Sequence, residues 1–185
     1  LYLSGSIVPG KTGFSLTAGG ASQFTSPTLL AVAADGTTVA DALRQPTDNL
    51  RFGVRVDHAL NPEHALRISY DRGATERRGL GIGGYNLPER GFRSTTTSNV
   101  VRVAENGPVG QRMFTESRLE LSWLSTGSGA DLESPAIRVI DAFTSGGAQV
   151  QGGQRAFEVE AATDLDYIVG AHALRFGTLV EGGRY

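Results

Sequence analysis

The chain has 185 residues, a formal net charge of −2 and no cysteine. This length suits one domain, the lack of cysteine excludes a disulfide framework and a thiolate metal site, and the lack of a basic excess argues against nucleic acid as a partner. No apolar run approaches the roughly 20 residues of a membrane helix, but membrane strands escape that test because only every second residue faces lipid.

Apolar and polar residues alternate along much of the chain, a pattern that predicts strands with one apolar face. Residues 50–56 read LRFGVRV, which places Leu, Phe and Val on one face and Arg and Gly on the other. Residues 66–71, 118–123, 157–169 and 174–181 alternate in the same way, and in all five segments the apolar face carries no charge. In chain order the pattern predicts eight strands, at about residues 1–8, 13–24, 46–60, 64–75, 97–107, 112–125, 155–169 and 172–183.

Alternation alone fits two architectures. A soluble sandwich also places apolar residues inside and polar residues in water. The 13-residue run at 157–169 favours a membrane barrel. Barrel strands need about 9–11 residues to cross the membrane, whereas strands of soluble proteins have a modal length of about 5–6.

Compact turns and long connections alternate between the predicted strands. Turn residues mark residues 9–12, 61–64, 107–110 and 169–172, and Gly/Ser/Thr-rich connections are expected at 25–48, 73–97 and 125–155. Outer-membrane barrels show this asymmetry, with short periplasmic turns and long extracellular loops. Within the long connections, residues 39–44 are a candidate turn of helix and residues 136–143 a candidate hairpin extension.

These patterns predict an all-β fold, an antiparallel up-and-down meander of about eight long strands that forms an open segment of a transmembrane β-barrel. The apolar face would meet lipid, and the charged face would line the lumen. The lipid-facing residues would include Phe52, Val54, Leu66, Ile68, Leu119, Leu121, Leu174 and Phe176. The lumen-facing residues would be Arg51, Arg55, Arg67, Arg118, Glu120, Glu158, Glu160 and Arg175.

A series of short motifs resembles one family. In order, the motifs are RVDH at residues 55–58, HALRISY at 64–70, GIGGYNLPERGF at 81–92, SPAIRVIDAFTSGGAQ at 134–149 and GAHALRFG at 170–177. The series resembles the barrel of Oar-like TonB-dependent receptors, which are large outer-membrane receptors that often carry a carboxypeptidase-regulatory-like domain. The resemblance covers most of the chain.

The resemblance implies a large single-chain barrel in the bacterial outer membrane, an N-terminal plug inside it, and energy supplied by the TonB system through the periplasm. The plug and the TonB-contacting segment are absent from this sequence, so residues 1–185 are expected to be barrel wall only. We expect the chain to be an excerpt of a longer protein, in which case the missing signal peptide says nothing about location. The implied partners are outer-membrane lipid, the protein's own plug, the TonB system and an extracellular ligand of unknown identity.

The implied function is ligand binding followed by gated import, with no enzymatic activity and no cofactor. Ligand contacts are expected in the long connections, because binding groups commonly lie on loops held by a rigid scaffold. The candidates are Arg77, Arg78, Tyr85, Asn86, Arg90, Arg138, Asp141 and Gln149. The alternative for these connections is that they only pack together as a rim. The alternatives for the protein are a structural or adhesive β-sheet surface protein without transport activity, and a small closed eight-stranded barrel.

Two further motifs have ordinary interpretations. GLGIGG at residues 79–84 matches the dinucleotide fingerprint, but the YNLP that follows does not open the helix that such a site needs. Paired carboxylates, which could chelate calcium or act as acid and base, occur at Glu158/Glu160 and Asp164/Asp166. Because such pairs lie about 7 Å apart along a strand, ion pairs with Arg67, Arg118 and Arg175 on neighbouring strands are expected instead.

The histidines and the large aromatic residues are further candidate sites. Three histidines lie beside compact turns without a metal-binding signature around them, and solvated side chains are expected for His58, His64 and His172. The candidates for aromatic girdles at the membrane interfaces are Tyr70, Trp123, Phe157 and Tyr167. Ordinary strand packing is the alternative for these aromatic side chains.

Overall fold

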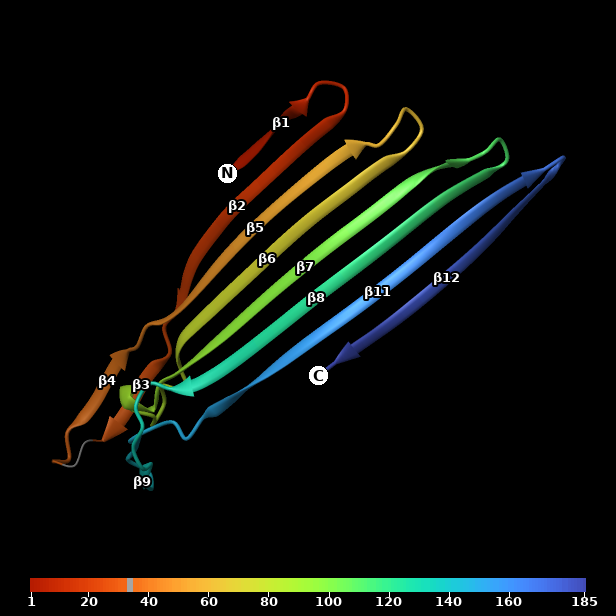
Figure 1. Ribbon diagram of the computed structural model, residues 1–185. Helices are drawn as coiled ribbons and strands as arrows, with labels where there is room; N and C mark the ends of the chain where they lie inside the picture. The colour runs from red at the N-terminus through yellow and green to blue at the C-terminus, as the bar shows by residue number, and fades with distance from the viewer. Residues whose placement is uncertain (33–34) are drawn as a thin grey trace.

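In the computed structural model, which describes residues 1–32 and 35–185, eight strands form one antiparallel sheet (Figure 1). Consecutive long strands of the chain are neighbours in this sheet, without a crossover. The strands are β1 (Tyr2–Val8), β2 (Thr12–Thr25), β5 (Gln45–Ala59), β6 (Ala65–Leu80), β7 (Phe92–Val109), β8 (Met113–Ala130), β11 (Gln151–Val169) and β12 (His172–Arg184). The predicted antiparallel meander of about eight long strands is confirmed.

The central strands extend farther toward the long connections than the sequence pattern predicts. The ladder between β7 and β8 continues to Phe92 and Ala130, and the ladder between β8 and β11 to Gly129 and Gln151. These strand ends are rich in Thr, Ser and Gly, which give no apolar alternation although Thr favours strands. The alternation therefore detects only the section of each strand that has an apolar face.

Each of the three long connections contains a small element of its own. The first holds the hairpin of β3 (Thr28–Val32) and β4 (Thr38–Ala42), the second the 3-10 helix η1 (Pro88–Arg90), and the third the hairpin of β9 (Ile137–Val139) and β10 (Phe143–Ser145). The predicted helical turn at residues 39–44 is wrong, because pairing with β3 makes most of this segment a strand. Residues 136–143, expected to extend the hairpin of β8 and β11, instead form β9 and the start of β10, which make a two-stranded sheet of their own.

All four compact turns lie at one end of the sheet, and the three long connections lie at the other end (Figure 1). The turns join β1 to β2, β5 to β6, β7 to β8 and β11 to β12. Gly10, Gly110 and Gly170 have φ values of 69°, 68° and 60° in these turns, a left-handed conformation that is easy for glycine. The predicted alternation of compact turns and long connections is confirmed.

The register places the apolar side chains of neighbouring strands on one face, which we call the apolar face. One row of partners across the strands consists of Leu3, Leu16, Val54, Tyr70, Val101, Leu121 and Val159. The next row toward the compact turns consists of Phe14, Val56, Ile68, Val103, Leu119, Ala161 and Val180. Because side chains alternate along a strand, the residues between these rows lie on the opposite, polar face.

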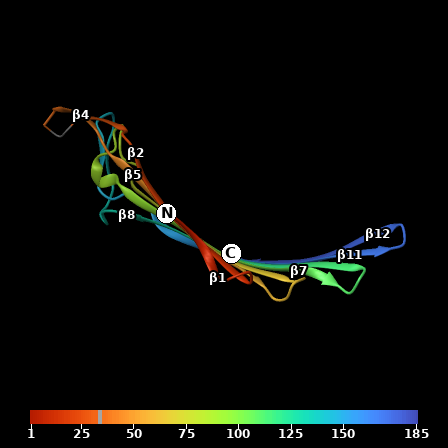
Figure 2. The ribbon, with the colours of Figure 1, turned by 90° about the horizontal axis from the view of Figure 1, so that it is seen from above.

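In the part of the chain that the structure describes, no second sheet covers the apolar face. The buried apolar residues there are Leu29, Ala31, Ala148 and Ala162, and the first three belong to the long connections. On the apolar face, Ile68, Leu174 and Phe176 are 44%, 46% and 58% exposed. Seen from above, the strands form a single twisted layer (Figure 2). The fold is therefore not a two-sheet sandwich. No helix among the described residues has the length and apolar character to cross a membrane.

The compact turns are staggered along the strand direction. Thr12, the last paired residue of the first hairpin, lies level with Thr163 of β11. The partners that connect these two residues are His58, Leu66, Glu105 and Ser117. β11 continues six residues beyond Thr163, to Val169, before the fourth compact turn. The turns thus advance by about one residue for each strand of the sheet.

The sheet is open along two edges, β1 and β12. Within residues 1–32 and 35–185 these two strands do not pair with each other, so the small closed barrel is not formed. Every residue of both strands is exposed. Each edge therefore presents a row of free backbone N–H and C=O groups that can pair with a further strand.

Candidate functional site

All eight residues that the sequence predicts to face a lumen lie on the polar face. One row of partners on this face includes Arg55, Arg102, Glu120, Glu160 and Glu181. The remaining predicted residues lie an even number of positions from a member of this row on their own strand, and they are Arg51, Arg67, Arg118, Glu158 and Arg175. An even separation along a strand keeps side chains on one face.

Ion pairs between neighbouring strands connect the charges of the polar face. Arg102 of β7 lies between Asp71 of β6 and Glu120 of β8, with N–O distances of 3.2 Å and 2.7 Å. All three side chains are about half exposed, so each contact contributes at most about 1 kcal/mol. The value of this arrangement is that it places no uncompensated charge at the centre of the face.

A second group of ion pairs covers β8, β11 and β12. Asp164, whose side chain is 24% exposed, lies 3.5 Å from Arg118 and 3.9 Å from Arg175. Arg175 also lies 3.6 Å from Asp166, and Arg118 lies 4.0 Å from Glu160. The expectation that these carboxylates pair with arginines of neighbouring strands is confirmed for these three.

The polar face of β5 and β6 carries a third group. Asp57 accepts hydrogen bonds from Arg55 and Arg67, both at 2.7 Å. Arg67 therefore pairs with Asp57 and not with the carboxylates of β11 that the sequence suggested. The reason is topological, because two strands separate β6 from β11 in the sheet.

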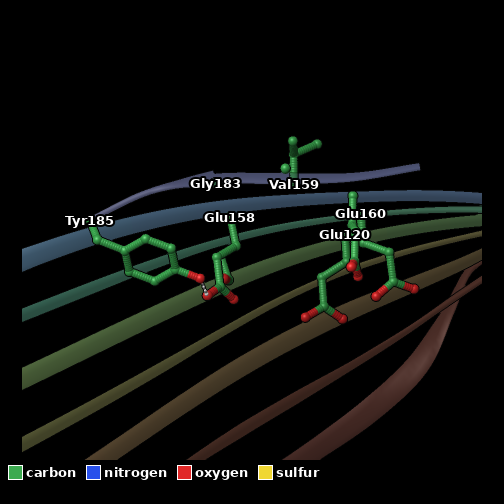
Figure 3. A pocket seen from close by; sticks show the side chains of 9 residues that line it. Glu120, Glu158, Val159, Glu160, Gly183 and Tyr185 are labelled. Carbon is green, nitrogen blue, oxygen red and sulfur yellow. Dashed lines mark hydrogen bonds between the residues drawn. The ribbon is translucent and has the colours of Figure 1, made fainter. Parts of the chain in front are cut away.

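Carboxylates gather where β8, β11 and β12 meet on the polar face (Figure 3). They line a shallow hollow of about 390 Å³ and belong to Glu120, Glu158, Glu160 and Glu181. The hydroxyl of Tyr185 donates to Glu158 at 2.7 Å, so this carboxylate has a neutral partner and not the predicted arginine. Among the described residues, no group of three His, Cys, Asp or Glu side chains is arranged to hold a metal ion.

The three long connections fold against one another at the end of the sheet. Backbone hydrogen bonds of 2.7–2.8 Å join Gly84 to β3, and others of 2.7–2.9 Å join Thr144 of β10 to Tyr85 and Leu87. Five extended segments pair side by side in the order β4, β3, residues 83–87, β10 and β9, so that β4 and β9 form the two outer edges. We call these five segments and η1 the loop assembly. Asn86, a predicted ligand contact, lies inside it.

Two more of the predicted ligand contacts hold the loop assembly together. Arg90 of η1 donates from its guanidinium to the backbone carbonyls of Gly147 and Ala148 in the third connection. Gln149 donates to the carbonyl of Ser134 at 2.6 Å. No sequence pattern indicates these roles, because the partners are backbone carbonyls far along the chain.

Three other candidates remain exposed on the loop assembly, namely Tyr85, Arg138 and Asp141. Tyr85 is 57% exposed, although its backbone is paired with β10. Asp141 has a φ of 58° in the turn between β9 and β10, a conformation that Asp tolerates better than most residues. Tyr85 and Arg138 thus have side chains that are free to meet a ligand.

Arg77 and Arg78 lie inside β6, which corrects their assignment to a loop. The sequence pattern misses this end of β6 because the residues around Arg77 and Arg78 do not alternate between apolar and polar. Arg78 contacts Asp48 of β5 at 2.5 Å and Glu76 at 4.0 Å, so its charge is already compensated.

Aromatic side chains form two pairs on the apolar face near the middle of the long strands. Trp123 and Phe157 are direct partners with ring centroids 5.8 Å apart, and Phe52 and Tyr70 are 6.4 Å apart. Tyr167, the fourth girdle candidate, lies on the same face at the opposite end of β11. Tyr167 thus lies at a different level along the strands from the two aromatic pairs.

His64, which was expected to be solvated, is held by β7. Its Nδ1 lies 2.5 Å from a carboxylate oxygen of Glu105, and its Nε2 lies 2.9 Å from the carbonyl oxygen of Pro108. Because both partners are acceptors, both ring nitrogens are donors and the ring is charged. The hydrogen bond with Glu105 raises the pKa of His64 above its ordinary value of 6.5. Gly107 makes room for the ring, since a Cβ at this position would collide with it.

The glycine-rich segment at residues 79–84 has the geometry of a loop. Gly79, Gly81, Gly83 and Gly84 all have positive φ values. The next helix, η1, begins only at Pro88 and has three residues. A pyrophosphate site needs the amides of a helix that opens directly on the glycines, and this segment does not provide them.

No protein-family model, curated protein or solved structure matches the chain. The resemblance of its motifs to Oar-like receptors therefore remains an expectation from the sequence.

Proposed function

We propose that the chain is part of the wall of a bacterial outer-membrane β-barrel, a TonB-dependent receptor that takes part in ligand binding and import. In this proposal the apolar face meets lipid, the polar face lines the lumen around a plug, and the loop assembly lies outside the cell. The observation that carries the proposal is an uncovered apolar face on a sheet whose turns are staggered by one residue per strand.

The uncovered apolar face needs an apolar partner. Apolar surface in water costs about 25 cal/mol per Å², and residues such as Phe176 and Leu174 leave half of their surface exposed. On this face the large apolar side chains of β8 run from Met113 to Trp123, and the outermost aromatic side chains of β11 are Phe157 and Tyr167. Ten residue steps span roughly 33 Å along a strand, or about 27 Å of membrane height after tilting, close to the roughly 25 Å apolar band of barrels.

The stagger of the turns supports tilted strands. If the compact turns lie in one plane, an advance of one residue per strand means a shift of about 3.3 Å for each strand spacing of about 4.8 Å. The strands would then be tilted by about 35° from the barrel axis, at the edge of the range of about 35–45° for barrels. A flat soluble sheet has no need for a constant shift of this kind.

The polar face fits the inside of a large barrel. Its ion pairs are about half exposed, which suits a wet lumen where charges remain hydrated. The two open edges would pair with the barrel strands that flank this segment, because an unpaired edge in lipid leaves backbone groups unsatisfied. The same requirement means that the segment alone does not make a stable membrane structure.

The alternative is a structural or adhesive surface protein without transport activity, and one observation favours it. Arg90 and Gln149, two of the predicted ligand contacts, are used for internal hydrogen bonds of the loop assembly. A rigid, self-contained loop assembly is what an adhesive or structural rim requires. The two functions differ in one measurable respect, since only a receptor accumulates ligand at the expense of TonB energy.

The lipid-facing assignment is tested with single cysteines in the complete protein, since residues 1–185 contain no cysteine of their own. Leu121→Cys and Val159→Cys lie on the apolar face, and Ser122→Cys on the polar face is the matched control. With a fluorescent label at each site, nitroxide groups on lipid acyl chains should quench positions 121 and 159 but not position 122. Equal quenching at positions 121 and 122 would rule out a membrane wall.

The import function is tested in cells that produce the complete protein. Accumulation of ligand from the medium should stop when the TonB system is removed, while binding of the ligand to the cell surface persists. If accumulation continues unchanged without TonB, the receptor assignment is wrong. If surface binding occurs and no accumulation is seen in either strain, the adhesive alternative is favoured.

A further inference from the structure

One row of partners on the apolar face combines aromatic rings with arginines. Across β5, β6, β7, β8, β11 and β12 it consists of Phe52, Arg72, Asn99, Trp123, Phe157 and Arg184. Arg155 lies on the same face, two residues from Phe157 and nearer to the long connections. The three arginine side chains are exposed.

These three arginines have no acidic partner, unlike most arginines of the polar face. On the polar face, salt bridges engage Arg55, Arg67, Arg102, Arg118 and Arg175. Among the described residues, no carboxylate oxygen lies within 4.0 Å of the guanidinium of Arg72, Arg155 or Arg184. Most arginines of the polar face are thus paired, whereas Arg72, Arg155 and Arg184 keep free positive charges.

The carboxylates nearest to this row on the apolar face are already used. Asp48 and Glu76, farther toward the long connections, both contact Arg78. On the apolar side of β8, β11 and β12 the described strands carry no Asp or Glu at all. Arg155 and Arg184 therefore have no carboxylate on their own face of these three strands, and their charges are available to an anion from outside the protein.

The local geometry prepares the arginines for such an anion. Arg155 and Arg184 are diagonal neighbours on paired strands, where Cβ atoms lie about 7–8 Å apart, so both guanidinium groups can reach one phosphate. Arg72 donates to Asn99 Oδ1 at 3.0 Å, and the hydroxyl of Tyr70 donates to the same oxygen at 2.8 Å. This anchoring positions the guanidinium of Arg72 and leaves its other N–H groups free.

We propose that this row binds the phosphate groups of anionic lipids in the membrane leaflet nearest to the long connections. The inference rests on the proposed barrel function, because only a lipid-embedded apolar face brings phosphates to this level. Guanidinium groups match phosphate oxygens with paired hydrogen bonds, and Trp and Tyr favour the membrane interface. The aliphatic stems of the arginines can lie along the apolar surface while their charged ends reach the phosphates.

The test measures lipid binding to the complete protein, purified in a neutral detergent, by native mass spectrometry. Phosphatidic acid is titrated against phosphatidylcholine of the same acyl chains. The test variant is Arg155→Gln with Arg184→Gln, and the control is Arg51→Gln with Arg77→Gln, which removes two exposed, unpaired arginines from the polar face. We expect the test variant to bind phosphatidic acid on the order of 20-fold more weakly, at about fivefold per arginine, and the control to keep wild-type affinity.

Three outcomes would overturn the inference. In the first, the wild type binds phosphatidic acid and phosphatidylcholine with equal affinity. In the second, the control variant loses as much affinity for phosphatidic acid as the test variant. In the third, an equal concentration of soluble glycerol phosphate displaces phosphatidic acid. The quenching of Leu121→Cys by lipid nitroxides is measured on the same preparations. If that quenching is present and the lipid preference is absent, only the phosphate inference fails. If the quenching itself is absent, the barrel proposal fails.

Discussion

The Nδ1 atom of His64 lies 2.5 Å from a carboxylate oxygen of Glu105, although 41 residues separate them in the sequence. The contact ties the compact turn between β5 and β6 to β7. Within that turn the side chain of Asn61 accepts hydrogen bonds from the backbone N–H groups of Glu63 and His64, both at 2.8 Å. Both ends of the turn are thereby fixed, one by Asn61 and the other by Glu105.

This pair predicts that stability falls as pH rises above neutrality. The pKa of His64 is raised above 6.5 by its hydrogen bond with Glu105, with Glu63 as a further negative neighbour. Below pH 6.5 the ring is charged in the folded and the unfolded state, so the contribution is fully present. As pH rises through the raised pKa the folded protein loses this charge, and the contribution disappears.

The measurement is the thermal unfolding midpoint of the complete protein between about pH 5.5 and pH 8.5, in the wild type and in His64→Gln. The midpoint of the wild type should decline over this range more steeply than that of the variant. His58 and His172 are present in both proteins, so the difference reports on His64. Parallel curves would show that the pair has no role in stability.

Gly107→Ala should destabilise the same region. The new Cβ would collide with the ring of His64, and overpacking of this kind costs about 1–3 kcal/mol. Gly129→Ala is the matched control, because a Cβ at that strand position meets nothing within 4 Å. The double variant Gly107→Ala with His64→Ala should recover part of the loss, and purely additive effects would contradict the proposed collision.

Much of the sheet could be predicted from the sequence, because alternation is a direct consequence of strand geometry. The segment from Leu50 to Val56 and the run from Phe157 to Val169 occupy the predicted strands and faces. The sequence pattern predicted each strand only as far as its apolar side chains continue. Beyond Trp123, β8 continues mainly with Ser, Thr and Gly, and beyond Phe157, β11 continues with Arg, Gln and Gly. The pairing of these residues depends on the neighbouring strand and not on their own pattern.

The loop assembly could not be predicted from the sequence for a related reason. Its order depends on backbone hydrogen bonds between segments such as β3 and β10, which carry no side-chain signal. Arg90 looks like a ligand contact in the sequence, because a charged residue in a glycine-rich loop usually faces solvent. The structure directs it to the carbonyls of Gly147 and Ala148, a partnership that no local pattern indicates.

Asp164→Asn should weaken the polar face by about 0.5–1 kcal/mol in free energy of unfolding. This side chain is the shared partner of Arg118 and Arg175, and its removal leaves both arginines with weaker contacts. Glu181→Gln is the control, since among the described residues Glu181 is exposed on the same face without a salt bridge. A loss as large in Glu181→Gln would mean that net charge matters and the pairing does not.

Arg90→Ala should loosen the loop assembly while leaving the sheet intact. The variant removes the side-chain hydrogen bonds that η1 makes to the third connection. Limited proteolysis should then cut residues 132–149 faster than in the wild type, with no change in the unfolding midpoint of the sheet. Arg138→Ala, at an exposed position of β9, should leave the cutting rate unchanged.

Ligand binding is the prediction that separates a receptor loop from an inert rim. Removing residues 130–154 is too coarse a test, because residues 151–154 pair with β8 and the cut would damage the sheet. Tyr85→Ala with Arg138→Ala instead removes two exposed side chains and no hydrogen bond of the loop assembly described above. If the loop assembly binds the ligand, this double variant should lower ligand affinity on the order of tenfold, as expected when the two side chains together contribute about 1.4 kcal/mol, while its proteolysis pattern stays that of the wild type. Arg90→Ala should change both readouts, since it acts on the ligand only through the shape of the loop assembly. Unchanged affinity in both variants would mean that the loop assembly is a structural rim, and that ligand contacts lie outside it.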